Sequence, residues 1–299
     1  MMQLALVAFV WLAVLVCVAG CAWRAWRYAS APVHLRWDLY PVAHETAKRR
    51  AYGGGHYEER EWWTHPRVTS LTGEAIAMLE EILVLRGVWL NNRRVFWGSL
   101  PFHWGLYLLL ATTAGIAAGA LGFRAPWFAT LLGVVAVLGG TLLLIGSSVL
   151  LRLRARDRGL RRYTTRLDRL NLAVFAVLGA LSAAVAAGPG GIESVWRAVA
   201  RVAVWQAPEA GALLSAQMAL ASVVLIYLPF TRMVHFFAKY FLYHDVRWDD
   251  RPLEAGSTME RRVQAALNFG VGWSADHIES GRTWAEVATS APPTPGKRP

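Results

Sequence analysis

Two histidines stand where long apolar runs of the chain meet polar sequence. His103 lies in residues 100–105, where one apolar run begins, and His235 follows residues 228–234, where another ends. An ionisable side chain in a membrane segment is a functional candidate by default. Taken singly, either imidazole is equally well explained as an interfacial side chain bonded to a backbone carbonyl. Two imidazoles at one depth on two helices are what the iron of a b-type haem needs as axial ligands.

The membrane segments that position these histidines are read from hydropathy. The chain is 55% hydrophobic, and a helix of roughly 20 apolar residues crosses the hydrocarbon core of a bilayer. Lipid offers no partner to an unpaired backbone group, so an all-α, five-helix transmembrane bundle is expected. The five runs long enough to span are residues 3–22, 101–122, 126–151, 171–188 and 211–231.

The distribution of basic residues predicts the orientation of these spans. Of the 31 Lys and Arg residues, 28 fall in the first and third loops and the C-terminal tail, and 3 fall in the other two loops. The positive-inside rule then places the N-terminus outside and the C-terminus in the cytoplasm. The protein is therefore expected to be a multi-pass protein of the bacterial inner membrane. The net charge of +11 is therefore topogenic, and the expected partner is the lipid bilayer, with no nucleic acid. With this topology, His103 and His235 both lie near the cytoplasmic face.

The same topology predicts four regions in the chain. Residues 1–22 form a first transmembrane helix, and residues 23–99 form an extended cytoplasmic connector. Residues 100–244 form a four-helix haem-binding region, and residues 245–299 form a cytoplasmic tail whose end is rich in proline. The connector contains an amphipathic helix over residues 74–89, placed either at the membrane interface or against a partner subunit.

Two further expectations concern the loops. Residues 192–205 are expected to form a short helix along the outer surface. The connector histidines have spacings that match no closed metal-ligand pattern, so we interpret them as surface or partner-contact residues. They are His34, His44, His56 and His65.

Residues 98–244 resemble the γ subunit of respiratory nitrate reductase, a membrane cytochrome b. The stretches that carry this resemblance are residues 100–105 (LPFHWG), 161–165 (RRYTT) and 228–235 (LPFTRMVH). The continuation at residues 236–241 and 246–250 is closer to one subgroup. That subgroup is the cytochrome b subunits of heterodisulfide-reductase-like menaquinol oxidoreductases, including those associated with dissimilatory sulfite reductase.

The resemblance also implies a difference in haem content. The nitrate reductase subunit holds two haems on four histidines, and two of the corresponding positions here are Thr113 and Gln217. Both missing ligands belong to the haem on the outer side. The resemblance therefore implies one haem b on the cytoplasmic side, with His103 and His235 as its iron ligands.

The neighbourhood of the histidines offers partners for a haem. Arg232, one turn from His235 on the same face, and Arg162, in the third loop, are candidates for binding the haem propionates, since a guanidinium suits a carboxylate. The alternative for Arg162 is topogenic charge. Gly105 either admits a flat ring or permits close helix packing. The polar groups of Thr112, Thr113 and Gln217 either contact a cofactor or bond neighbouring helices, and we expect the second.

The function that the resemblance implies is electron transfer. The chain would carry electrons between the menaquinone pool and a cytoplasmic iron–sulfur subunit similar to heterodisulfide reductase D, and terminal catalysis would belong to that partner. Tyr107, Arg124 and His244 are candidate quinone donors, although a structural role suits each better. A haem-free membrane anchor of the same kind of complex is the alternative. A transporter is disfavoured because the five spans show no repeat and no buried acids.

Overall fold

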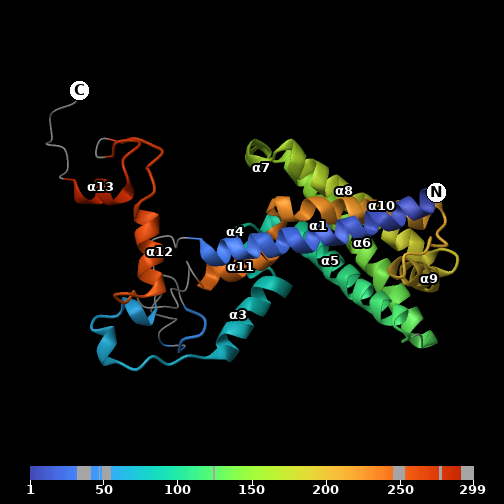
Figure 1. Cartoon of the computed structure of the whole chain (residues 1–299), viewed down its shortest axis with the longest axis horizontal. Coiled ribbons are helices and arrows are strands. Elements are labelled where there is room, and N and C mark those ends of the chain that lie inside the picture. Colours follow the sequence, from blue (N-terminus) through green and yellow to red (C-terminus); the bar gives the residue numbers. More distant parts are fainter. Residues whose placement is uncertain are drawn as a thin grey trace. The chain divides into compact units, whose positions relative to one another are not determined.

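Helices dominate the computed structural model, which describes residues 1–31, 42–46, 48, 55–123, 125–244, 253–275 and 278–290. The part described contains isolated β-bridges but no β-strand. Five helical segments in it are long and apolar enough to cross a membrane, so the all-α, five-span prediction is confirmed (Figure 1). These are α1 (Met2–Ser30), α5 (Arg93–Ala120), α6 (Pro126–Arg156), α8 (Arg166–Ala187) and α10 (Ala212–Tyr227), which η3 (Leu228–Phe230) extends.

The chain folds into two compact units. The first unit contains Met1–Gly20 and Met78–Thr231, and the second contains Cys21–Ala77 and Arg232–Pro299. In the first unit the shorter helices are α4 (Arg86–Asn91), α7 (Arg158–Tyr163) and α9 (Gly191–Ala203). The second unit holds η1 (His56–Glu58), η2 (Trp62–Thr64), η4 (Arg232–Val234), α11 (His235–Leu242), α12 (Thr258–Leu267) and α13 (Trp284–Thr289), and α3 (Leu71–Leu83) begins in it.

Local sequence explains where the membrane helices begin and end. The side chain of Asn92 accepts from the Val95 amide and caps the start of α5. Pro126 stands in the first turn of α6, where its missing N–H costs no hydrogen bond. Thr165 and Asp168 form a capping box at the start of α8. The helix α8 ends before Gly188, where the apolar run stops.

Glycines hold α5, α6 and α8 together. A Cβ atom on Gly105 of α5 would lie 2.5 Å from the Leu143 amide nitrogen and 2.8 Å from the Gly139 carbonyl oxygen, both in α6. On the adjoining face of α6, a Cβ atom on Gly140 would lie 2.5 Å from the Gly179 carbonyl oxygen of α8. The backbones of these helices are therefore in direct contact, and Gly105 serves helix packing.

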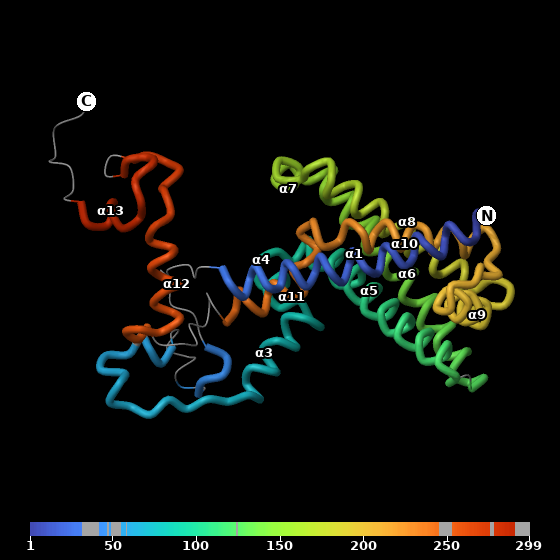
Figure 2. The backbone as a smooth tube through the Cα atoms, in the orientation of Figure 1, coloured from blue at the N-terminus to red at the C-terminus, as the bar shows by residue number. Residues whose placement is uncertain are grey.

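The helix α9 closes one end of this bundle. Its buried side chains Ile192 and Trp196 pack on Leu132 and Ala136 of α6. Figure 2 shows the trace of α9 beside α6 and α8, which it also contacts. The short helix expected over residues 192–205 is confirmed, although it ends at Ala203 and Trp205 takes a left-handed backbone conformation with φ of 58°.

The amphipathic helix expected over residues 74–89 is interrupted. The helix α3 ends at Leu83, and the buried Leu85 has a left-handed φ of 52° before α4 begins at Arg86. Side chains of α5 explain the early end: Tyr107 Oη donates to the Ile82 carbonyl at 2.9 Å and Trp104 Nε1 donates to the Leu83 carbonyl at 3.0 Å. Carbonyls of the last turn, which lack helical partners, are thereby satisfied from α5.

The second unit has its own aromatic and polar contacts. Tyr28 at the end of α1 packs against Phe237 and Phe241 of α11, with ring centroids 6.1 and 5.9 Å apart. The Arg262 guanidinium of α12 donates to the Ala31 carbonyl at 2.8 Å. Part of the tail is therefore helical, while its proline-rich end lies outside the described residues.

We expect Gly105→Ala to lower the free energy of unfolding by about 1–3 kcal/mol, because the added methyl group would push α5 away from the backbone of α6. Unfolding of the full chain by SDS in mixed micelles, followed by circular dichroism, measures this change. The matched control is Gly133→Ala on α6, where the nearest atom to the added Cβ is 3.8 Å away. That variant should be neutral or more stable, and equal losses in both variants would contradict the packing role.

Candidate functional site

His103 lies on the second long helix of the bundle, α5, and is half-buried. Its Nδ1 atom is 2.7 Å from the Ser99 carbonyl oxygen, one turn earlier in the helix. A carbonyl oxygen only accepts, so Nδ1 is the donor in this bond. Histidines that bind a metal through Nε2 commonly have this second bond, which fixes the tautomer and the orientation of the ring.

His235 is the first residue of α11, and its side chain is exposed. Its Nδ1 atom is 3.2 Å from the Arg232 carbonyl oxygen and is the donor in this bond, as in His103. The helical path between the span expected over residues 211–231 and His235 is interrupted. Thr231 is extended, with φ of −114° and ψ of 178°, and two short 3-10 turns flank it.

The two histidines belong to different units of the chain: His103 to the first and His235 to the second. Their pairing on one iron atom therefore stays a prediction. The two candidate propionate partners are exposed, Arg162 on α7 and Arg232 on η4. The predicted role of each in binding a cofactor also stays a prediction.

Thr113 and Gln217, at the positions that the resemblance assigns to outer haem ligands, make structural hydrogen bonds. Thr113 Oγ1 donates to the Leu109 carbonyl at 2.8 Å, and Thr112 makes the equivalent bond to Leu108 at 2.9 Å. The bonds expected from these threonines to a neighbouring helix are therefore wrong, since the hydroxyls satisfy carbonyls of their own helix. For Gln217 the expectation is right: its amide nitrogen donates to Ser182 Oγ of α8 at 3.0 Å.

The candidate quinone donors that the structure describes also make structural contacts. Tyr107 Oη bonds the end of α3, as described above. His244 Nε2 lies 3.3 Å from Glu74 Oε1 in the second unit, and its ring centroid is 4.3 Å from that of Tyr240. Arg124 lies outside the described residues.

Comparison with protein families decides which class of membrane protein this is. The model of the nitrate reductase gamma subunit matches residues 88–248, which is more than half of the chain. The chain belongs to the nitrate reductase gamma subunit family. A search of curated proteins and a search of solved structures found no match.

This membership establishes the general character of the chain. Members of the nitrate reductase gamma subunit family are haem-containing cytochrome b subunits of multi-subunit complexes in quinone-linked electron transfer. Together with five apolar helices, the membership makes the chain a multi-pass protein of the inner membrane. The match covers α4 to α11 and leaves most of the connector outside.

Outside the gamma subunit match, the connector contains a buried polar cluster that the sequence analysis missed. His44 and His56 are 6% and 3% exposed, so their interpretation as surface residues is wrong. Arg67 Nη2 lies 2.8 Å from His44 Nε2, and Arg67 Nη1 donates to Tyr57 Oη at 3.1 Å. Glu45 Oε1 accepts from the His56 amide at 2.9 Å.

The members of this cluster come from separate turns, so no regular spacing in the sequence links them. The local density of aromatic and charged residues was the one feature of the sequence that could have predicted a buried cluster here. His65 is exposed as expected, and His34 lies outside the described residues.

We expect Tyr107→Phe to loosen the end of α3 without unfolding the bundle, because it removes one hydrogen bond, worth about 0.5–1.5 kcal/mol. Amide hydrogen exchange over residues 80–88 should become faster by roughly two- to thirteenfold, which is that free energy expressed as a ratio. The control is Tyr163→Phe on α7, whose side chain is exposed. Unchanged exchange in Tyr107→Phe would show that the hydroxyl does not anchor α3.

Proposed function

We propose that this chain is the cytochrome b subunit that carries electrons between menaquinone and a cytoplasmic iron–sulfur partner. It uses one haem b near the cytoplasmic face, with His103 and His235 as the iron ligands. The observation that carries the proposal is the family match over residues 88–248, which includes both histidines. Each imidazole has Nδ1 bonded to a backbone carbonyl, at 2.7 Å from Ser99 and 3.2 Å from Arg232. This bond fixes the ring orientation in metal-binding histidines, and interfacial histidines make it as well.

The residues at the other two family ligand positions argue against a second haem. Neither a threonine hydroxyl nor a glutamine amide is a usual axial ligand of haem iron. Thr113 and Gln217 are moreover held in bonds to Leu109 and Ser182. A ligand position whose side chain links two helices is better explained as bundle packing than as a haem site.

Each residue of the proposed site has a separate task. His103 and His235 would hold the iron, and the carbonyls of Ser99 and Arg232 would fix the orientation of the imidazole rings. The guanidinium groups of Arg232 and Arg162 would neutralise the propionates. When bound, the haem supplies one-electron redox chemistry, and the protein supplies ligation and the surrounding charge.

The partner and the quinone follow from the topology and from the resemblance. A haem near the cytoplasmic face would pass electrons to an iron–sulfur subunit that resembles heterodisulfide reductase D. The connector of residues 23–99 would be the docking platform for that subunit. Its buried cluster around Arg67 supports this role, because a packed connector offers a defined surface.

A haem-free anchor is the second candidate function. The exposure of His235 and the absence of a histidine at positions 113 and 217 favour it. Haem content separates the two candidates, since both predict the same partner and the same membrane location.

The full chain, purified in mild detergent, is expected to carry one haem b. His103→Ala and His235→Ala should each retain less than about a tenth of it, because one axial ligand holds haem weakly. A dithionite-reduced minus oxidised spectrum with a pyridine haemochrome assay gives the number. The control is His65→Ala, at an exposed histidine of the connector, and this variant should keep the full haem content. Retention of haem by both ligand variants would exclude the proposed site, and absence of haem from the unaltered chain would favour the anchor.

We further expect Arg232→Gln to lower the midpoint potential of the haem by roughly 20–60 mV, the size expected of one charge in a partly solvated site. Ferric haem carries one more positive charge than ferrous haem, so removing a nearby cation favours the oxidised form. Potentiometric titration measures the shift. Arg60→Gln is the control, since the Arg60 side chain is 94% exposed in the connector. Equal potentials in all three proteins would remove Arg232 from the haem environment.

A further inference from the structure

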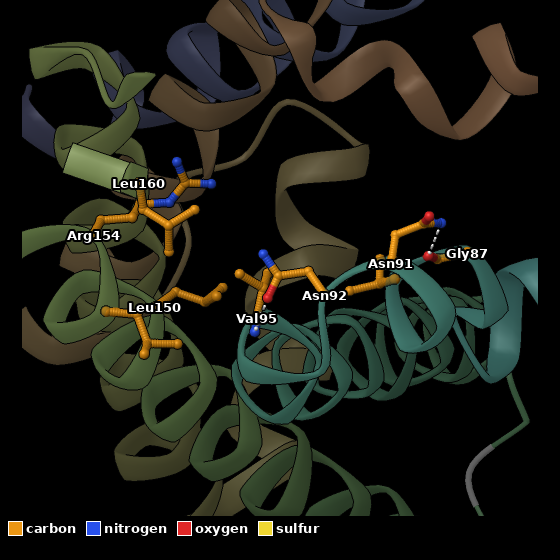
Figure 3. Close-up of a pocket in the computed structure, with 9 residues that line it drawn as sticks. Gly87, Asn91, Asn92, Val95, Leu150, Arg154 and Leu160 are labelled. Atoms are coloured by element: carbon orange, nitrogen blue, oxygen red, sulfur yellow. Dashed lines mark hydrogen bonds between the residues drawn. The ribbon is translucent and has the colours of Figure 1, made fainter. Parts of the chain in front are cut away.

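A cavity of about 370 Å³ lies at the end of the bundle where α5 begins and α6 ends (Figure 3). Its volume is within the range of small-ligand sites, roughly 300–1,000 Å³. Residues of α4, α5, α6 and the start of α7 line it, so its walls belong entirely to the first unit. The wall is mainly apolar, with side chains of Val88, Val95, Leu150, Leu153 and Leu160.

One cationic side chain, Arg154 of α6, stands in this apolar wall. Its Nη1 atom makes a long hydrogen bond of 3.4 Å to Thr164 Oγ1. Its Nε atom is buried and has no acceptor among the residues that the structure describes. Figure 3 shows the Arg154 side chain beside Leu160. A buried donor without an acceptor costs free energy, which an anionic oxygen in the cavity would restore.

The charged residues around the cavity also favour an anion. The two segments that supply the wall, residues 86–96 and 150–165, contain nine arginines and one acidic residue, Asp157. That carboxylate lies 3.7 Å from Arg94. Two more carboxylates are near: Glu81 lies beside Gly87 of the wall, and Glu80 pairs with Arg86. Arginines still outnumber acids there, and the N-terminus of α5, capped by Asn92, adds a partial positive charge.

We propose that this cavity binds one anionic phospholipid, with its phosphate at Arg154 and an acyl chain along the apolar wall. A guanidinium suits a phosphate, and basic pockets between transmembrane helices on the cytoplasmic side bind anionic headgroups. The apolar wall selects a lipid over a free phosphate ion, because a free ion would leave that wall without contacts. The ends of α5 and α6, where arginines replace apolar residues, stand at the level of the headgroups. The proposal does not depend on haem or on a partner subunit.

Native mass spectrometry of the full chain in mild detergent tests the proposal. We expect phosphatidylglycerol to bind about tenfold more tightly than phosphatidylcholine with the same acyl chains. Arg154→Gln should lower the affinity for phosphatidylglycerol about tenfold and leave the affinity for phosphatidylcholine unchanged. Arg152→Gln is the matched control: the residue is exposed, lies two positions away on α6 and does not line the cavity. It should change affinity by less than about twofold. Equal losses in the two variants would overturn the proposal, since only the general positive charge would then matter.

A second variant and a competitor complete the test. Val88→Phe fills part of the cavity without changing charge, and it should weaken both lipids if the acyl chain lies there. Unchanged binding would place the lipid elsewhere and overturn the proposal. Inorganic phosphate should not displace bound phosphatidylglycerol at equal concentration. Displacement at equal concentration would instead identify a free-phosphate site. Thermal unfolding of each variant confirms that binding is compared between folded proteins.

Discussion

Direct backbone contact between α5 and α6 is the constraint on which the orientation of the site depends. In lipid, helices gain little from burying apolar side chains, so close packing of small residues drives their association. Gly105 turns one face of α5 toward Leu143 and Gly139 of α6. His103 precedes Gly105 by two residues, which is about 200° around the helix axis. The glycine contact therefore turns His103 to the face of α5 that points away from α6.

The same contact places α6 at the centre of the bundle. Gly139 and Gly140 are consecutive, so they lie about 100° apart around α6 and serve two different neighbours. Gly139 meets α5, and Gly140 meets Gly179 of α8. A side chain at either position would require two helices to separate. The orientation of α8, and with it the Ser182 hydroxyl that binds Gln217, thus follows from the packing of small residues.

The spans could be predicted from the sequence because hydropathy over about 20 residues reports the bilayer directly. Breaks within helices were harder to predict, since they depend on contacts between distant segments. The helix α3 ends early because Tyr107 and Trp104, more than 20 residues away, bind its last carbonyls. Likewise, the sequence predicts the end of the apolar run near Thr231 but not the extended backbone there, between two turns. Non-local hydrogen bonds leave no period in the sequence.

For the candidate site, residue type was predictable and local environment was not. The histidines could be selected because polar, ionisable side chains are rare where apolar runs meet polar sequence. Their ring orientation depends on bonds to the carbonyls of Ser99 and Arg232, which only backbone geometry reveals. The buried state of His44 and His56 could not be predicted either, because their partners come from turns without regular spacing. Gly105 shows the same limit. The sequence allowed it either to admit a flat haem ring or to permit close helix packing, and the backbone of α6 beside it decides for packing.

The proposal of a single haem has a physical consequence for the electron path. A family member with two haems has redox centres on both sides of the bilayer, so electrons can cross its full thickness. In this chain Gln217, a position that the resemblance assigns to the outer haem, instead binds Ser182 and ties α10 to α8. If the proposed haem near the cytoplasmic face is the one redox centre, a quinone must exchange electrons on that same side. Electrons and the protons of the quinone would then enter or leave the cytoplasm together. Such a reaction moves no charge across the membrane, so the proposed complex would transfer reducing equivalents without itself generating a membrane potential.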